Sequence, residues 1–127
     1  MSKIVLDASV ALAVLANEPG ADEVIPLLAD SVMSAVNFAE VQGKLVGRGM
    51  PNVNATSAIT GIVSEFPPFD FEQAAYAGSL ITMTKAPGLS LGDRCCLALG
   101  FNLKAPVYTT DKSWQGLDLG FPIHVIR

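Results

Sequence analysis

Short apolar segments alternate with longer stretches of helical periodicity along the chain. Five of these segments have the length and composition of strands, namely residues 3–6, 31–34, 68–71, 106–109 and 122–126. Strands separated by helices require crossover connections, which are right-handed and leave the strands parallel. Because sheets twist, the pattern predicts a three-layer α/β/α domain with a mainly parallel, twisted, five-stranded sheet.

Helices are predicted between these strands, and local signals mark their ends. Pro19 and Gly20 in "NEPG" end the first helix, and the third follows "SAVN" and ends near Arg48 and Gly49. The other expected helices span residues 21–28, 54–66, 72–85 and 91–102, with a short last one after Asp111. The first helix covers residues 8–16. A chain of 127 residues can bury a sizeable core, so we expect one domain over residues 1–127.

Composition limits the kinds of protein this can be. Half of the residues are hydrophobic, yet no apolar run is long enough to span a bilayer and the N-terminus lacks a signal-peptide pattern. We therefore expect a cytoplasmic protein with no membrane partner. A net charge of −4 argues against binding nucleic acid through a broad basic face. The adjacent Cys95 and Cys96 match no zinc spacing and are expected to be buried thiols.

Four acidic residues are predicted to gather at one edge of the sheet. Asp7 and Asp111 directly follow strands, Asp93 lies in the first turn of a helix, and Glu40 lies one to two turns into another. Ligands of such sheets bind outside the carboxyl ends of the strands. Carboxylates gathered there repel one another unless a proton or a cation intervenes. Oxygen ligands without His or Cys favour a hard ion, so we expect Mg²⁺ or Mn²⁺.

Each acid also has a purely structural interpretation. Asp7 and Ser9 can cap the first helix, and Glu40 can be an ordinary solvated residue. Asp93 ends "SLGD", which fits a capping box, and Asp111 can begin a short helix. Only the position of all four where the parallel topology converges favours a metal site.

The same stretches carry a family resemblance. "IVLDASVAL", "SAVNFAEV", "LSLGDRCCLAL" and "VYTTDKSW", in this order, resemble a PIN-domain ribonuclease, specifically the VapC-like toxin of a bacterial toxin–antitoxin pair. The resemblance implies a twisted parallel sheet between helices, a homodimer and a cognate antitoxin. It also assigns the metal-binding acids and two polar helpers, which are Asp7, Glu40, Asp93, Asp111, Ser9 and Thr110. Asn37 and Phe38 depart from the plainer aliphatic helix that is common before the glutamate.

The predicted reaction is hydrolysis of RNA phosphodiester bonds. Bound Mg²⁺ or Mn²⁺ would supply a nucleophile at neutral pH and positive charge opposite the developing negative charge. Asp7 and Asp93 are the expected direct ligands, while Glu40 and Asp111 bind a second ion or orient the attacking water. The only histidine, His124, is expected to be structural.

Basic residues near the site would meet the phosphates, and Lys85, Arg94 and Lys112 are the candidates, although Arg94 can equally pack along its own helix. We expect a homodimer that forms through the third to fifth helices. We also expect the antitoxin to lay an apolar segment on the helices of the domain.

Other classes fit the sequence less well. A phosphoacceptor signalling domain needs a further acid pair and a late lysine, and a dehalogenase-type phosphotransferase needs a second Asp where Ser9 stands. A non-enzymatic module, in which the acidic site holds a basic partner segment, stays open.

Overall fold

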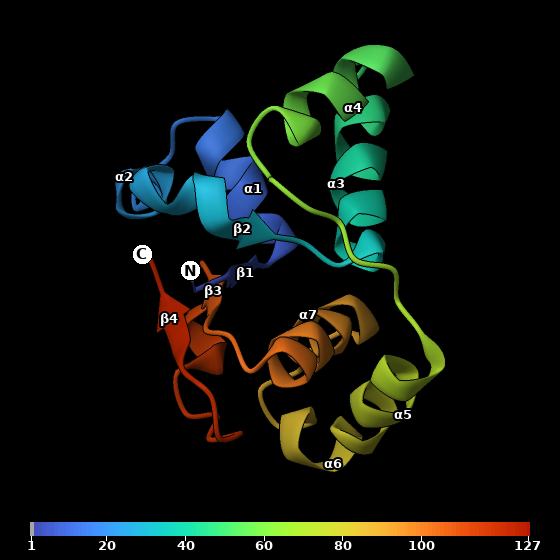
Figure 1. Ribbon diagram of the computed structural model, residues 1–127, viewed down its shortest axis with the longest axis vertical. Helices are drawn as coiled ribbons and strands as arrows, with labels where there is room; N and C mark the ends of the chain where they lie inside the picture. The colour runs from blue at the N-terminus through green and yellow to red at the C-terminus, as the bar shows by residue number, and fades with distance from the viewer. Residues whose placement is uncertain (1) are drawn as a thin grey trace.

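The centre of the molecule is a parallel sheet of four strands. A computed structural model describes residues 2–127 of the chain. The strands are β1 (Ile4–Leu6), β2 (Ser31–Val32), β3 (Val107–Thr109) and β4 (Ile123–Val125), in the order β2-β1-β3-β4 (Figure 1). Val5 pairs with Val32 on one side and Val107 on the other, and Val107 pairs with Ile123. The predicted α/β class and parallel sheet are confirmed.

The predicted fifth strand at residues 68–71 is wrong. The chain is extended slightly earlier, where Glu65 makes one parallel bridge to β2. The carbonyls of Glu65 and Pro67 accept hydrogen bonds from the N–H groups of Met33 (2.9 Å) and Ala35 (3.1 Å). Pro67 and the proline after it have no N–H with which to continue the ladder. This segment therefore runs along the edge of β2 without becoming a strand.

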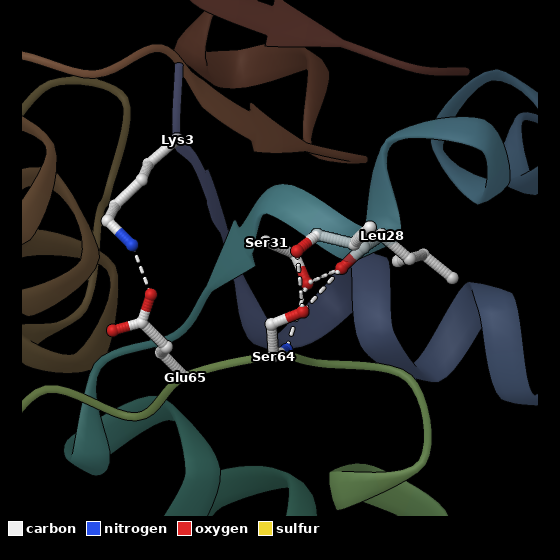
Figure 2. A network of polar contacts seen from close by, with 6 residues as sticks. Lys3, Leu28, Ser31, Ser64 and Glu65 are labelled. Atoms are coloured by element: carbon white, nitrogen blue, oxygen red, sulfur yellow. Dashed lines mark hydrogen bonds and ion pairs between the residues drawn. The ribbon is translucent and has the colours of Figure 1, made fainter. Parts of the chain in front are cut away.

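Side chains hold this edge segment in place, as Figure 2 shows. The Ser31 and Ser64 hydroxyls both donate to the carbonyl of Leu28, at 2.7 and 3.0 Å. Lys3, next to β1, forms an ion pair with Glu65. These contacts connect three segments that are distant in the sequence and protect the exposed edge of the sheet.

The helices lie between the strands largely as predicted. They are α1 (Ala8–Leu15), α2 (Ala21–Val24), α3 (Ala35–Gly47), α4 (Asn52–Thr60), α5 (Phe71–Ser79), α6 (Ile81–Thr84) and α7 (Leu91–Leu103), with 3₁₀ turns η1 (Ile25–Asp30) and η2 (Lys112–Trp114). The predicted helix 21–28 tightens into η1 where Pro26 enters. The predicted helix 54–66 ends at Thr60 because the chain must leave it to reach β2. The predicted helix 72–85 divides at Leu80, which is buried.

Two apolar clusters cover the two faces of the sheet. Ile4 and Leu6 of β1 pack with residues of α1 to α4, while Val5 between them packs with α7 and Trp114. This alternation is the period of a strand whose two faces are both buried. Figure 1 shows α1 and α2 on one side of the sheet and α7 on the other. Among the helices of residues 2–127, none has the length and apolar character needed to cross a membrane.

Candidate functional site

A cleft of about 530 Å³ opens beside the carboxyl ends of β1 and β3. Because parallel strands end at the same edge, the residues that follow β1 and β3 both reach it. All four predicted acids and both predicted polar helpers line it. Its lining residues are Asp7, Ala8, Ser9, Leu12, Ala16, Glu18, Glu40, Lys44, Arg48, Ser90, Asp93, Thr110, Asp111 and Arg127.

Asp7 lies at the base of this cleft and is held by two hydroxyl groups. The Ser9 and Thr109 hydroxyls donate to its Oδ2 at 2.7 and 2.8 Å. The Ser9 oxygen also accepts from the backbone N–H of Thr110 at 3.1 Å. The Thr109 oxygen accepts from the N–H of Asp111, also at 3.1 Å. The end of β3 is thereby fastened to the end of β1 through the carboxylate.

Burial disfavours the charge on this carboxylate. Asp7 is only 4% exposed, and burial raises its pKa from 3.8 to about 6. The Ser9 and Thr109 hydrogen bonds oppose the rise in pKa, and the negative charge of Asp93 adds to it. Burial also raises the pKa of the Cys96 thiol on α7, with the charges of Asp7, Asp93 and Glu40 acting in the same direction. Negative charge is therefore concentrated at this point of the molecule.

Glu40 is placed by contacts between α3 and α7. Asn37, one turn earlier on α3 and fully buried, donates through Nδ2 to Glu40 Oε1 at 2.8 Å and to the Gly92 carbonyl at 3.0 Å. The Glu40 carboxylate lies so close to Gly92 that a Cβ there would be 2.2 Å from Oε2. Only glycine therefore leaves room for Glu40 in this position. The Asn37 Oδ1 atom is buried with no hydrogen-bond partner within residues 2–127.

Asp93 and Asp111 each cap a helix, and each also lines the cleft. Asp93 forms a complete capping box with Ser90, in which Asp93 Oδ2 accepts from the Ser90 N–H at 2.9 Å and Ser90 Oγ accepts from the Asp93 N–H at 3.2 Å. Asp111 Oδ1 accepts from the Ser113 N–H at 2.9 Å and caps η2. Both side chains also line the cleft. Capping and a place in the site are thus compatible.

The four carboxylates share one arrangement. In Glu40, Asp93 and Asp111, one oxygen accepts a hydrogen bond and the other has no protein donor within residues 2–127. In Asp7 the two hydroxyl donors share Oδ2 and leave Oδ1 without a side-chain donor. One oxygen of each group orients the side chain, and the other can receive a ligand.

The donor set fits a hard divalent cation. It consists of carboxylate oxygens alone, which suit Mg²⁺ or Mn²⁺, and a bound cation would offset the cost of keeping the buried Asp7 carboxylate charged. As the side chains lie, however, no three Asp, Glu, His or Cys residues among residues 2–127 converge closely enough to enclose an ion. Rotation of the side chains about their tethered oxygens would have to complete such a site.

Sequence reasoning missed Thr109 and the contacts of Asn37. The motif "TTD" contains two threonines, and the one that contacts Asp7 is Thr109, whereas Thr110 contributes its backbone N–H. Strand alternation was the available signal, because residues 107 and 109 point to the same face and Thr109 is fully buried. Asn37 was noted only as a departure from the family pattern.

The basic residues of the cleft also differ from those expected. Lys44, Arg48 and Arg127 line it, and none of Lys85, Arg94 and Lys112 does. Arg94 instead packs against α5, donating through Nη1 to the Ala77 carbonyl at 3.0 Å. His124 stacks on Tyr108 with ring centroids 4.7 Å apart, outside the cleft. Both cysteines are buried, as predicted.

Comparison with known proteins identifies the family. A model of the PIN domain family matches residues 4–118. Among solved structures, the fold is similar to VapBC2 of Rickettsia felis bound to a promoter DNA fragment, with 17% identity, 98% of each chain covered and a TM-score of 0.75. DNA-bound VapBC of Salmonella typhimurium is 16% identical over 100% of each chain, with a TM-score of 0.78.

A third similar structure is VapC20 of Mycobacterium tuberculosis, described as a sarcin–ricin loop cleaving toxin. It is 16% identical over 91% of this chain and 97% of that chain, with a TM-score of 0.68. No curated protein sequence matches the chain. The structural similarities are similarities of fold, and they agree with the family model, which spans most of the chain. On this evidence the protein belongs to the PIN domain family.

Proposed function

We propose that the protein is a metal-dependent endoribonuclease that acts as the toxin of a toxin–antitoxin pair. The observation that carries this proposal is the set of four carboxylates in one cleft, each with one oxygen tethered and one available. Membership of the PIN domain family and a fold shared with a sarcin–ricin loop cleaving toxin support it.

In this proposal Asp7, Glu40, Asp93 and Asp111 hold Mg²⁺ or Mn²⁺. A bound ion would lower the pKa of a coordinated water and offset charge on the phosphate. Hydrolysis adds a water oxygen to phosphorus and breaks the bond from phosphorus to one ribose oxygen, which takes up a proton as it leaves. No histidine lines the cleft within residues 2–127, so carboxylate oxygens are the groups available to take the water's proton.

The remaining residues of the site orient these acids. Ser9 and Thr109 hold Oδ2 of Asp7 and so direct its other oxygen away from them. Asn37 holds Glu40 against the first turn of α7, beside Asp93. Positioning of this kind lowers the cost of organising the site during the reaction.

Substitution of Asp93 tests the proposal, and substitution of Asp70 is its control. Both residues hold the N-terminus of a helix, but only Asp93 lines the cleft. Asp70 caps α5 by accepting from the Gln73 N–H at 2.9 Å and does not line the cleft. Asp93→Asn and Asp70→Asn should each lose about 0.3 to 1 kcal/mol of capping stability. For Asp93→Asn, relief of repulsion with Asp7 should offset that loss when metal is absent.

RNA cleavage in millimolar Mg²⁺ or Mn²⁺ is the decisive measurement. We expect cleavage by the parent protein and by Asp70→Asn, and at least about a hundredfold loss in Asp93→Asn and Asp7→Asn. Undiminished cleavage in excess chelator would overturn the metal dependence. A parent protein that binds a basic partner but cleaves no RNA would favour the non-enzymatic module.

The proposed partners are a cognate antitoxin and a second copy of the chain. Several structures with this fold are VapBC complexes. For the dimer, α4 and α5 present Val53, 78% exposed, and Phe71, 88% exposed, and such apolar side chains favour association. Light scattering at micromolar concentration should give the dimer mass for the parent and a lower mass for Phe71→Ser. Co-purification of this protein with the product of the neighbouring gene tests whether that product is the antitoxin.

A further inference from the structure

The cleft has a basic end as well as an acidic one. Lys44 and Arg48 line the same cleft as Glu40, and all three come from α3 and its C-terminal cap. The residues are four apart, so they lie along one face of the helix. At 1.5 Å of rise per residue, Lys44 is about 6 Å beyond Glu40 along the helix axis, and Arg48 about 12 Å beyond it.

Lys44 and Arg48 are exposed and form no ion pair within residues 2–127. Within residues 2–127, the ion pairs are Lys3 with Glu65 and Arg127 with Glu18, the latter at 2.5 Å. Arg127, the third basic residue of the cleft, is therefore already paired. Cations near the C-terminus of a helix offset its dipole, but this effect does not select the face that lines the cleft.

Because the protein is negatively charged overall, an RNA substrate would need basic residues such as Lys44 and Arg48 in the cleft. The protein has a net charge of −4, and four carboxylates lie at the other end of the cleft. Cations bound at the acids would balance charge only there. Phosphates further along a strand would meet a negatively charged protein unless basic side chains faced them.

We propose that Lys44 and Arg48 bind the backbone phosphates of single-stranded RNA beside the scissile phosphate. The strand then runs along α3, from the acids toward the C-terminal end of the helix. Arg48 can bind a phosphate through two N–H groups, and Lys44 acts as a point charge. The inference rests on the proposed function, because it takes RNA as the substrate of this cleft.

The test compares two double variants with the same net charge. Lys44→Gln with Arg48→Gln removes the proposed contacts. Lys85→Gln with Lys112→Gln removes two exposed lysines that do not line the cleft. Both pairs are made in the Asp7→Asn background so that the RNA stays intact. Fluorescence anisotropy measures binding of a labelled ten-nucleotide single-stranded RNA over a range of salt concentrations in Mn²⁺.

We expect Lys44→Gln with Arg48→Gln to weaken binding by about tenfold at low salt. The slope of log K against log salt should fall in magnitude by about 1.4, since each phosphate contact on a single strand contributes about 0.7. The control pair should keep the slope of its parent. Equal losses in both pairs, an unchanged slope in the first pair, or no RNA binding by the parent would each overturn the proposal.

Cleavage by the protein with Asp7 intact separates this inference from the proposed function. If that protein cleaves RNA while the Lys44 and Arg48 substitutions change neither binding nor cleavage, only the phosphate contacts fail. If the substitutions abolish salt-dependent binding but the parent cleaves no RNA, the contacts stand and the proposed hydrolysis fails.

Discussion

Asp7 contributes a carboxylate to the candidate site, but its burial lowers the stability of the folded protein at neutral pH. Its carboxylate is buried, and the raised pKa of about 6 means that folding favours its protonated form. Between pH 3.8 and about 6 the folded protein binds more protons at Asp7 than the unfolded chain does. The free energy of unfolding contributed by this group therefore falls as the pH rises through that window.

Replacing Asp7 with Asn should consequently stabilise the metal-free protein at pH 7. The difference between 3.8 and about 6 corresponds to an effect on the order of 3 kcal/mol. The Asn side-chain oxygen can still accept from Ser9 and Thr109. Denaturant melts in chelator should show Asp7→Asn more stable than the parent by about 1 to 3 kcal/mol at pH 7. The gap should narrow below pH 6 and close near pH 4.

Millimolar Mn²⁺ provides the control for this prediction. Metal bound by the parent but not by Asp7→Asn should stabilise the parent and reduce or reverse the gap at pH 7. A gap that stays constant from pH 4 to pH 7 in chelator would contradict the assignment of the raised pKa to Asp7.

The two adjacent threonines provide a second prediction at this scale. Thr109→Val keeps the shape but removes the donor to Asp7 and the acceptor for the Asp111 N–H. It should cost about 1 to 3 kcal/mol and reduce cleavage. Thr110→Val leaves the backbone N–H bonded to Ser9, so it should change stability by at most about 0.5 kcal/mol. Equal losses of stability in chemical denaturation would show that the Thr109 hydroxyl does not hold the site together.

At the level of secondary-structure elements, the site depends on how α3 meets α7. Asn37 bonds both Glu40 on its own helix and the Gly92 carbonyl on the other. Gly92 in turn leaves space for the Glu40 carboxylate. Neither helix alone sets the position of Glu40 relative to Asp93, because that position is defined by the contact between them.

Gly92→Ala should separate folding from activity. Alanine in a helix is favoured over glycine by up to about 1 kcal/mol, and the atoms that its Cβ would meet belong to the flexible end of Glu40. The variant should fold with a stability within about 1 kcal/mol of the parent, while the displaced Glu40 lowers cleavage at least about tenfold.

Gly43→Ala on α3 is the matched control for Gly92. A Cβ at Gly43 would meet nothing within 4 Å, so this variant should gain stability and keep its activity. Thermal melts and cleavage rates measured together would check both variants. Full activity in Gly92→Ala would show that Glu40 tolerates displacement.

On the scale of the whole molecule, the turn after α1 packs against Ile126, the residue that follows β4. Gly20 has a φ of +93°, and a Cβ there would lie 1.9 Å from the carbonyl oxygen of Ile126. Two residues earlier, Glu18 forms an ion pair with Arg127 beside the cleft. The turn after α1 and the C-terminal residues thus meet at one border of the candidate site.

Gly20→Ala should therefore destabilise the molecule more than its backbone angle alone requires. We expect a loss of about 2 to 4 kcal/mol, because the clash is with backbone and cannot be relieved by a rotamer change. Gly49 has a φ of +103° but open space around it, so Gly49→Ala should lose only about 1 to 2 kcal/mol. Urea unfolding of both variants makes the comparison, and equal losses would mean that the turn and the last strand separate easily.

Local patterns in the sequence were sufficient for the fold class, the order of the strands along the chain and most helices. Hydrophobic periodicity and capping residues act over a few neighbours, so they can be recognised without a structure. The acids Asp7, Glu40, Asp93 and Asp111 were likewise predicted to meet, since parallel topology brings the strand ends to one edge. The structure places all of them in one cleft.

Features that depend on contacts between distant segments required the folded molecule. The segment at residues 68–71 was apolar enough for a strand, but two prolines and the pairing of Glu65 with β2 decided otherwise. The roles of Thr109 and Asn37 arise from partners 102 and 55 residues away. Lys44 lines the cleft because it is on α3 with Glu40, whereas Lys85 follows α6 and does not line the cleft. The residues adjacent to a side chain in the sequence do not reveal such partners, because only the packing of helices and strands brings the distant residues together.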